Sequence, residues 1–285
     1  MKKVIFIAML ICLIFPSNKE KILTLNEPLY NIKSMKVNID YSLGNLVIEA
    51  GQPDMAVTGY LKYFYQNIDG LLEYEKFGST GILRLETEVD IDWDINYKNY
   101  GKNKVYNESE LYLSPKIPLK MNVDVGMGKS TLSLQQLKIE NFVLDCGMCE
   151  TKVDFGESYN PVDCMKIDVD AGLGSATLKN LLNSNSDQME FECGLGTMNL
   201  EFGGQLKHDV EVDISVGLGA VNIEIPKGTN VIFKYDGSFL SSVDLDDFSN
   251  HGDEYRSRVI NDANFTIYIT GSIGAGSLKI KWIEN

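Results

Sequence analysis

The chain has 285 residues, of which 44% are hydrophobic and 10% aromatic, so it contains enough apolar material for a packed core and is not a disordered chain. Asp and Glu outnumber Lys and Arg by 40 to 26, and the resulting net charge of -14 argues against nucleic acid and anionic lipid surfaces as partners, because the chain repels phosphates. Cations, basic proteins and neutral sugars remain as candidate partners.

The N-terminus has the features of an export signal. A short basic start at residues 2–3 is followed by an apolar run at residues 4–15, which is too short to span a bilayer comfortably. We therefore expect residues 1–19 to direct export, and the rest of the chain to be periplasmic, on the cell surface or secreted. An uncleaved N-terminal anchor is one alternative. Lipidation at Cys12 is another, although Ile11 stands where a small residue is wanted.

Residues 20–120 are predicted to form an N-terminal β region without helices. From residue 35 to 118, apolar and polar residues alternate over several stretches, for example at Val37 and Ile39. A period of two is typical of a strand with one buried face. One polar and aromatic stretch, Asp90 to Glu110, is predicted to be a long surface loop.

Residues 121–285 contain a repeat built on glycine tripeptides. The Gly-x-Gly tripeptide recurs every 21 to 25 residues, and a last copy follows an acidic insertion near residues 238–262. Its glycines are Gly126, Gly128, Gly147, Gly172, Gly174, Gly194, Gly196, Gly217, Gly219, Gly274 and Gly276. A unit of about 22 residues cannot bury its own apolar face and must stack on its neighbours. The repeat therefore predicts an all-β solenoid whose coils lie about 4.8 Å apart.

The apolar phase changes at each tripeptide. Before it, apolar residues alternate up to the central residue, as in Val123, Val125 and Met127, so the central residue is predicted to face the core. After the tripeptide, the alternation resumes with an apolar residue five positions beyond the central one, as at Leu132 after Met127. An odd step requires the chain to slip by one residue, and glycine tolerates the backbone geometry of such a corner.

Four cysteines follow the signal, and an even count in an exported chain permits disulfides. Cys146 and Cys149 have the spacing of a redox or zinc pair, but there is no second such pair and the chain has 2 histidines, a thin supply of ligands. We expect the four cysteines to be buried small apolar residues. Cys146 and Cys193 fall in one inward column with Ala171 between them, about 10 Å apart, which is too far for a disulfide.

Carboxylates recur at fixed positions before the tripeptides and predict an acidic interaction face. If the inward positions are right, these side chains all point outward and stack coil on coil, and they are Asp124, Asp145, Asp168, Asp170, Glu190, Glu192 and Asp213. Oxygen-rich clusters attract calcium, and a negative face attracts basic partners. The alternative is an ordinary solvated face, partly neutralised by Lys129 and Lys152.

A catalytic set is not recognisable, so we predict neither an enzyme nor a cofactor. The run from Gly126 to Thr131 ends like a phosphate-binding loop, but Val123 stands where that pattern requires glycine, and a strand follows where it requires a helix. His208 and His251 are both expected in solvated loops, and the nucleophile motif of a serine hydrolase is missing.

The stretch from Ser109 to Leu134 resembles the signature of bacterial toast-rack domains. There a proline-containing element, here Pro115 and Pro118, leads into the first Gly-x-Gly coil, here Gly126 to Gly128. The stretch from Val216 to Gly228 is similar to the C-terminal part of such proteins and of related adhesin-like proteins. The resemblance implies a right-handed single-stranded β-helix in the cell envelope. Some relatives are membrane-anchored regulators of envelope stress, but their multi-helix anchor is not expected here, so that role is not carried over.

These features together predict a non-catalytic extracytoplasmic β-solenoid. It would be a scaffold or adhesin-like module whose acidic face binds an envelope protein or a glycan. The alternative is a calcium-dependent β-helix that binds or cleaves polysaccharide, with aromatic residues of the stretches 60–65 and 93–100 stacked on sugars. A cleaving enzyme needs a groove lined by Asp, Arg and Lys, whereas a scaffold needs only a flat column of side chains.

Overall fold

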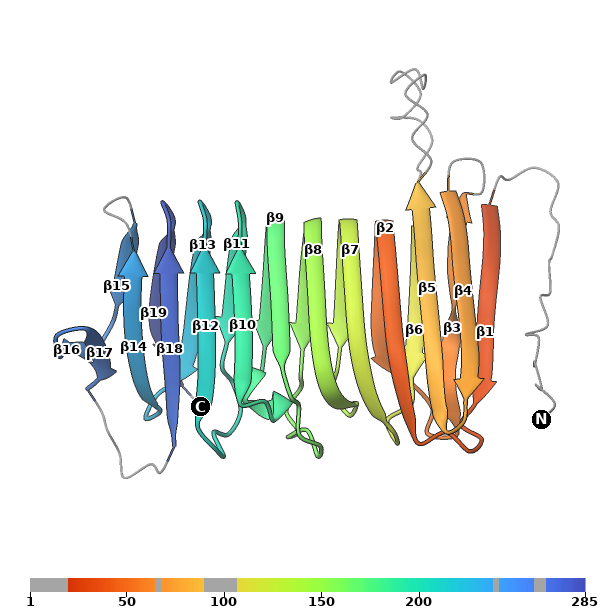
Figure 1. Ribbon diagram of the computed structural model, residues 1–285, viewed down its shortest axis with the longest axis horizontal. Coiled ribbons are helices and arrows are strands. Elements are labelled where there is room, and N and C mark those ends of the chain that lie inside the picture. The colour runs from red at the N-terminus through yellow and green to blue at the C-terminus, as the bar shows by residue number, and fades with distance from the viewer. Residues whose placement is uncertain (1–19, 65–67, 90–106, 238–240, 259–264, 285) are drawn as a thin grey trace, which may run out of the picture.

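The structure is a computed structural model that describes residues 20–64, 68–89, 107–237, 241–258 and 265–284. These residues are all-β, as predicted, apart from one short 3-10 helix, Leu181–Ser184. The strands are β1 (Glu20–Pro28), β2 (Ser34–Ala50), β3 (Met55–Phe64), β4 (Ile68–Phe77), β5 (Thr80–Val89), β6 (Asn107–Leu113), β7 (Pro118–Ser133), β8 (Lys138–Asp154), β9 (Ile167–Lys179), β10 (Gln188–Cys193), β11 (Thr197–Glu201), β12 (Val210–Val216), β13 (Ala220–Pro226), β14 (Asn230–Gly237), β15 (Ser242–Leu245), β16 (Phe248–Asn250), β17 (Glu254–Ser257), β18 (Thr266–Ile273) and β19 (Ser277–Ile283). Figure 1 shows them side by side along the long axis, from β1 at one end to β14–β17 at the other.

The middle of the molecule is a stack of parallel coils. β2 pairs in parallel with β7, β7 with β8, and β8 with β9. In the next coils the long strand is replaced by two shorter ones, so that β10 and β11 both pair with β9, and β12 and β13 pair with β10 and β11. Residues at equivalent positions of successive coils therefore lie side by side, about 4.8 Å apart. A residue type that repeats in the sequence becomes a column on the molecule.

The last coil is inserted out of chain order at the C-terminal end. β18 lies between β12 and β14, and β19 lies between β13 and β15 (Figure 1). The chain first skips one place in the stack, then adds the hairpin of β16 and β17, and finally returns to fill the gap. In its described part, the acidic insertion predicted near residues 238–262 contains the three strands β15, β16 and β17.

Antiparallel strands complete the N-terminal end. β1 pairs with β3, β3 with β6, and β4 with β5, while β5 and β6 pair in parallel with the two halves of β2. The loop predicted from Asp90 to Glu110 is too long, because β6 begins at Asn107 and buries that side chain completely. Residues 90–106 lie outside the described residues. The pairing of β2 with β7 crosses the expected boundary at residue 120, and the division into two regions stays a prediction.

Each coil has two arms, one before and one after its tripeptide, and both arms turn alternate side chains into a shared core. In β7 the first arm buries Val123 and Val125, and the second arm buries Leu132. The predicted core residues of the second arms are all buried, namely Ile48, Leu132, Val153, Leu178, Leu200, Ile223 and Ile280. The prediction that the central residue faces the core is wrong, because Met127 is 47% exposed. Two successive outward residues, Gly126 and Met127, account for the odd step in the apolar phase.

The predicted export signal, residues 1–19, lies outside the described residues. Nowhere in the described part of the chain is there a helix with the length and apolar character that a membrane crossing requires.

Candidate interaction surface

The carboxylates expected on the outer face lie in two columns on the first arms. Strand register places Asp124 beside Asp145, Asp145 beside Asp170, and Asp170 beside Glu192. Asp40 of β2 precedes Asp124 in this column. The sequence repeat does not mark Asp40, because Ser42-Leu43-Gly44 stands in β2 where later coils have Gly-x-Gly. The first carboxylate column is therefore Asp40, Asp124, Asp145, Asp170 and Glu192, and all five residues are exposed.

The second carboxylate column lies two residues upstream on the same arms and consists of Asp168, Glu190 and Asp213. A lysine neutralises it in part. Lys166 Nζ lies 2.8 Å from a carboxylate oxygen of Asp168 and 2.6 Å from one of Glu190. Hydrogen bonds to these two carboxylates raise the pKa of Lys166.

The first carboxylate column has no such counter-charge. In the described part of the chain, no Lys or Arg forms an ion pair with any of its members. Partial burial raises the pKa of Asp124, and the neighbouring charges of Asp40 and Asp145 raise it further. The pKa of Asp170 is raised in the same way, first by burial and then by Asp145 and Asp168. The column is thus a line of like charges that repel one another.

The two lysines expected to neutralise this face are engaged elsewhere. Lys129 Nζ lies 2.8 Å from one carboxylate oxygen of Glu150, and Lys152 Nζ lies 3.3 Å from the other. These hydrogen bonds lower the pKa of Glu150. All three residues lie after the tripeptide, on the second arm, so the expectation that Lys129 and Lys152 offset the acidic face is wrong.

An exposed apolar ridge runs beside the first carboxylate column. It consists of the central residues of the tripeptides, which are Met127 (47% exposed), Met148 (51%), Leu173 (41%), Leu195 (57%) and Leu218 (64%). Register places Met127 beside Met148 and Met148 beside Leu173. Leu195 and Leu218 continue the line, because their amides donate to the carbonyls of Gly172 and Gly194 of the preceding coils.

A line of glycines separates the carboxylates from the ridge. Gly126, Gly147, Gly172, Gly194 and Gly217 stack on one another, so that a Cβ on each would lie 2.7 to 3.0 Å from a carbonyl oxygen of the coil before. The amides of Gly194 and Gly217 already donate between coils, to the carbonyls of Ala171 and Cys193. A partner that lies along this line therefore meets side chains on both sides and backbone that is already hydrogen-bonded.

At Gly128 and Gly174, the third position of the tripeptide requires glycine for a different reason. Gly128 has a φ of 134° and Gly174 a φ of 135°, in the region that side chains rarely adopt. A Cβ at Gly128 would collide with the carbonyl oxygen of Gly44, and one at Gly174 with that of Cys149. Close packing between coils thus adds to the conformational requirement.

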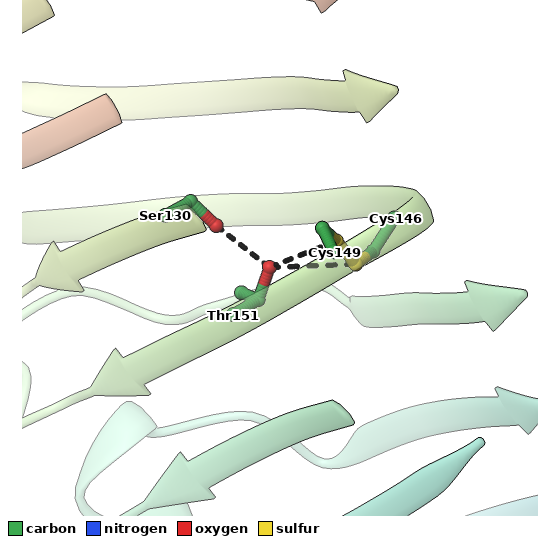
Figure 2. The surroundings of a disulfide bond; sticks show 4 residues. All are labelled: Ser130, Cys146, Cys149 and Thr151. Atoms are coloured by element: carbon green, nitrogen blue, oxygen red, sulfur yellow. Dashed lines mark hydrogen bonds between the residues drawn. A yellow bond between two sulfur atoms is a disulfide. The ribbon is translucent and has the colours of Figure 1, made fainter. Parts of the chain in front are cut away.

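Cys149 occupies the third position in its own coil and forms a disulfide with Cys146, with Cα atoms 5.9 Å apart (Figure 2). Both are buried, as expected, but the prediction that they are simply small apolar residues is wrong. The Thr151 hydroxyl lies 3.2 Å from Cys149 Sγ, 3.4 Å from Cys146 Sγ and 2.6 Å from the hydroxyl of Ser130, so the bridge has buried polar neighbours (Figure 2).

The other two described cysteines are free thiols in the core, as expected of small apolar residues. Burial raises the pKa of Cys164 to about 12 and also raises the pKa of Cys193. Register confirms that Cys146, Ala171 and Cys193 share one inward column.

An open cleft of about 940 Å³ lies at the N-terminal end. Its charged lining consists of Lys21, Asp40, Asp69, Glu86 and Glu88, without arginine. Leu43 and Met127 also line it, so the first carboxylate column and the apolar ridge both begin in this cleft. Ser42 and Thr87 also line the cleft, and the Thr87 hydroxyl already accepts a hydrogen bond from the Ser42 amide at 2.9 Å.

The metal site and the catalytic histidine considered from the sequence can be checked against the described residues. Among the described residues, no three His, Cys, Asp or Glu side chains are grouped so that they could hold a metal ion, and calcium binding stays a prediction. His208 Nδ1 lies 2.9 Å from the Asp209 carbonyl, and His251 Nε2 lies 3.1 Å from the Ser249 hydroxyl. Both histidines lie in loops, away from the carboxylate columns.

Comparisons with known proteins identify a family and several solved structures. The model of the family described as "N-terminal domain of toast_rack, DUF2154" matches residues 16–179. A protein described as a "putative cell adhesion protein", from Clostridium sporogenes, is 19% identical, with a TM-score of 0.46 over 93% of this chain and 99% of that chain. A "putative adhesin" from Bacteroides fragilis is 12% identical, with a TM-score of 0.32 over 92% and 97% of the two chains. A "putative lipid binding protein" from Parabacteroides distasonis is 11% identical, with a TM-score of 0.29 over 93% and 98%. No curated protein matches the chain.

Proposed function

The chain belongs to the toast-rack family, whose sequence pattern covers residues 16–179, and from this premise we propose that it is a non-catalytic, adhesin-like interaction module of the cell envelope. Its acidic outer face would bind an envelope protein or a glycan. The chain would act by presenting side chains in fixed columns, without transforming the bound molecule.

The observation that carries this proposal is the first carboxylate column. A solvated outer face ordinarily mixes charges of both signs, and such surface pairs contribute little. Here five exposed carboxylates follow one another in register, and no Lys or Arg of the described chain pairs with them. Repulsion within such a line is relieved when a partner supplies positive charge or hydrogen-bond donors.

One feature of the sequence and one of the structure support a location outside the cytoplasm. The apolar run at residues 4–15 fits an export signal, and the disulfide between Cys146 and Cys149 requires an oxidising compartment to persist.

The fold that would present these columns is a right-handed single-stranded β-helix, in which each tripeptide turns the chain from one arm to the next. Support comes from the parallel register between successive coils and from the tight stacking of the glycine lines. In such a solenoid, residues 21 to 25 apart in sequence meet in space, so a local sequence repeat becomes a continuous binding surface.

The test is affinity capture from an extract of the organism's own cell envelope. The bait is the chain from Glu20 onward, with and without calcium, and excess free bait serves as competitor. We expect a specific envelope protein or an intact glycan that the free bait displaces. A polysaccharide that shortens with time would overturn the non-catalytic assignment, and an eluate without any displaceable component would overturn the interaction role.

A further inference from the structure

We infer that the first carboxylate column and the apolar ridge together form a docking strip for a basic amphipathic helix of a partner polypeptide, which lies along the stack of coils. This rests on the proposed function and specifies the chemistry and shape of the partner. Four coils of the strip have both a ridge residue and a carboxylate three residues before it, as in Asp145 and Met148 or Asp170 and Leu173.

The apolar half of the strip points to a partner, because its side chains are exposed at every step. Isolated apolar residues are ordinary on a protein surface, but five in a continuous line, each 41% to 64% exposed, form a patch that a partner can cover. The glycine line beside the ridge has no side chains, and the amides of Gly194 and Gly217 in it already donate to carbonyls of the preceding coils. A partner therefore binds here through side-chain contacts and not by adding a strand.

The acidic half of the strip determines the charge of the partner. The net charge of the chain is -14, and the four carboxylates from Asp124 to Glu192 have no cation of their own in the described residues. A second copy of this chain would bring a like-charged column against the first, and an anionic membrane would do the same with phosphates. A polypeptide with lysines or arginines next to its apolar residues satisfies both halves at once.

The spacing of the coils matches a helical partner. Successive coils are about 4.8 Å apart, close to the 5.4 Å pitch of an α-helix, so each turn of a partner helix lies opposite about one coil. The ridge from Met127 to Leu218 spans four such steps, about 19 Å, which corresponds to about 13 helical residues. Apolar residues three or four apart would follow the ridge, and lysines on the adjoining face would follow the carboxylates.

The test measures binding of a fluorescent synthetic helix of 18 residues, composed of Leu and Lys in an amphipathic pattern, to the chain from Glu20 onward. Two control peptides accompany it, one with Glu in place of Lys and one with the same Leu and Lys in scrambled order. We expect anisotropy to show binding of the first peptide, with affinity that falls as salt rises. Equal binding of the scrambled peptide would overturn the inference, because it would show attraction without the required geometry.

Variants locate the site. We expect the triple variant Asp124→Asn, Asp145→Asn, Asp170→Asn to weaken binding about ten-fold, and Leu173→Ser with Leu195→Ser to weaken it by a similar factor. The matched control is Glu49→Gln, Glu157→Gln, Asp253→Asn, which removes the same charge from exposed positions elsewhere and should leave affinity within about two-fold. Equal weakening by both triple variants would overturn the strip as the site. The triple Asn variant should remain folded, because it removes repulsion.

Two further measurements separate this inference from its competitors and from the proposed function. Binding of the chain to zwitterionic phosphatidylcholine vesicles that depends on Leu173 and Leu195, without peptide binding, would identify a lipid surface and overturn the helix. A concentration-dependent dimer that the same two substitutions abolish would identify a second copy. If Leu173→Ser with Leu195→Ser leaves capture of the envelope component unchanged while the triple Asn variant abolishes it, the inference fails while the proposed function stands.

Discussion

At Gly128 two requirements coincide, a left-handed backbone and contact with the carbonyl of the coil before. We predict that Gly128→Ala destabilises the protein by about 3 kcal/mol, because the methyl group forces the coils apart in addition to the strain at φ 134°. Urea denaturation followed by circular dichroism measures the loss.

The matched control for this substitution is Gly78→Ala. Gly78 has a φ of 65°, but a Cβ there would meet nothing within 4 Å. It should cost about 1 kcal/mol from backbone strain alone. Equal losses at the two glycines would show that contact between coils is not what requires glycine at Gly128.

The Cys146–Cys149 disulfide closes a short loop at the one tripeptide that lacks its second glycine. In the chain-entropy account, a bridge over so few residues contributes about 2 kcal/mol, and we predict that reduction lowers the free energy of unfolding by that amount. The same reductant should leave the Cys146→Ala, Cys149→Ala variant unchanged. For the chain from Glu20 onward, thiol titration after unfolding should find two free thiols before reduction, from Cys164 and Cys193. Four free thiols before reduction would contradict the bridge.

On the scale of an element, the first carboxylate column should make stability depend on pH. The pKa of Asp124 is raised in the folded chain, so the folded state binds protons more readily than the unfolded state there. By linkage, this residue lowers stability above its folded pKa, and the penalty disappears as the pH falls through the folded pKa to below the ordinary value of 3.8. Asp124→Asn should therefore stabilise the protein at pH 7 and have little effect below that ordinary value.

Glu150 provides the control of opposite sign for this pH experiment. Its pKa is lowered by Lys129 and Lys152, so its contribution is present at pH 7 and is lost as the pH falls below the ordinary value of 4.5. Glu150→Gln should destabilise slightly at pH 7, whereas Asp124→Asn should do the reverse. If both substitutions shift the thermal midpoint in the same direction at pH 7, the self-repelling column is contradicted.

Most of each coil could be predicted from the sequence because its causes are local. Alternation with period two places Val123 and Val125 on the inner face whatever the neighbouring coil contains. The exposed position of Met127 could not be predicted in this way, since an apolar residue on a ridge has the same hydropathy as one in the core. The partner of Lys129 depends on which arm it occupies, so its pairing with Glu150 emerged only from the folded register.

The disulfide and the order of the last coils could not be predicted from the sequence, because in each case one pattern fits more than one structure. Cys146 and Cys149 have the same spacing in a redox pair, a zinc site and a bridged corner. The insertion of β18 between β12 and β14 depends on which of two similar coils stacks first, and both have the same alternating pattern.

For the whole molecule, the inserted coil of β18 and β19 joins β14 and β15 to the rest of the stack. We predict that removal of residues 265–285 lowers the thermal midpoint on the order of 10 °C, because β14 loses β18 and keeps β17, β15 loses β19, and Ile269 and Leu278 leave the core. Removal of residues 229–285 takes away the complete end and should have a smaller effect, since only the coil of β12 and β13 loses a neighbour. A larger effect of the longer truncation would contradict the inserted order.

Photocrosslinking in living cells tests most directly whether the chain presents its ridge and carboxylate column to a partner. A photoreactive residue at Leu173, on the ridge, is compared with one at Thr177, which faces outward on the second arm of the same strand. We predict a discrete adduct with one polypeptide from Leu173, its loss when Asp145 and Asp170 are changed to Asn, and no adduct from Thr177. The same adducts from both positions, or none from either, would contradict this prediction.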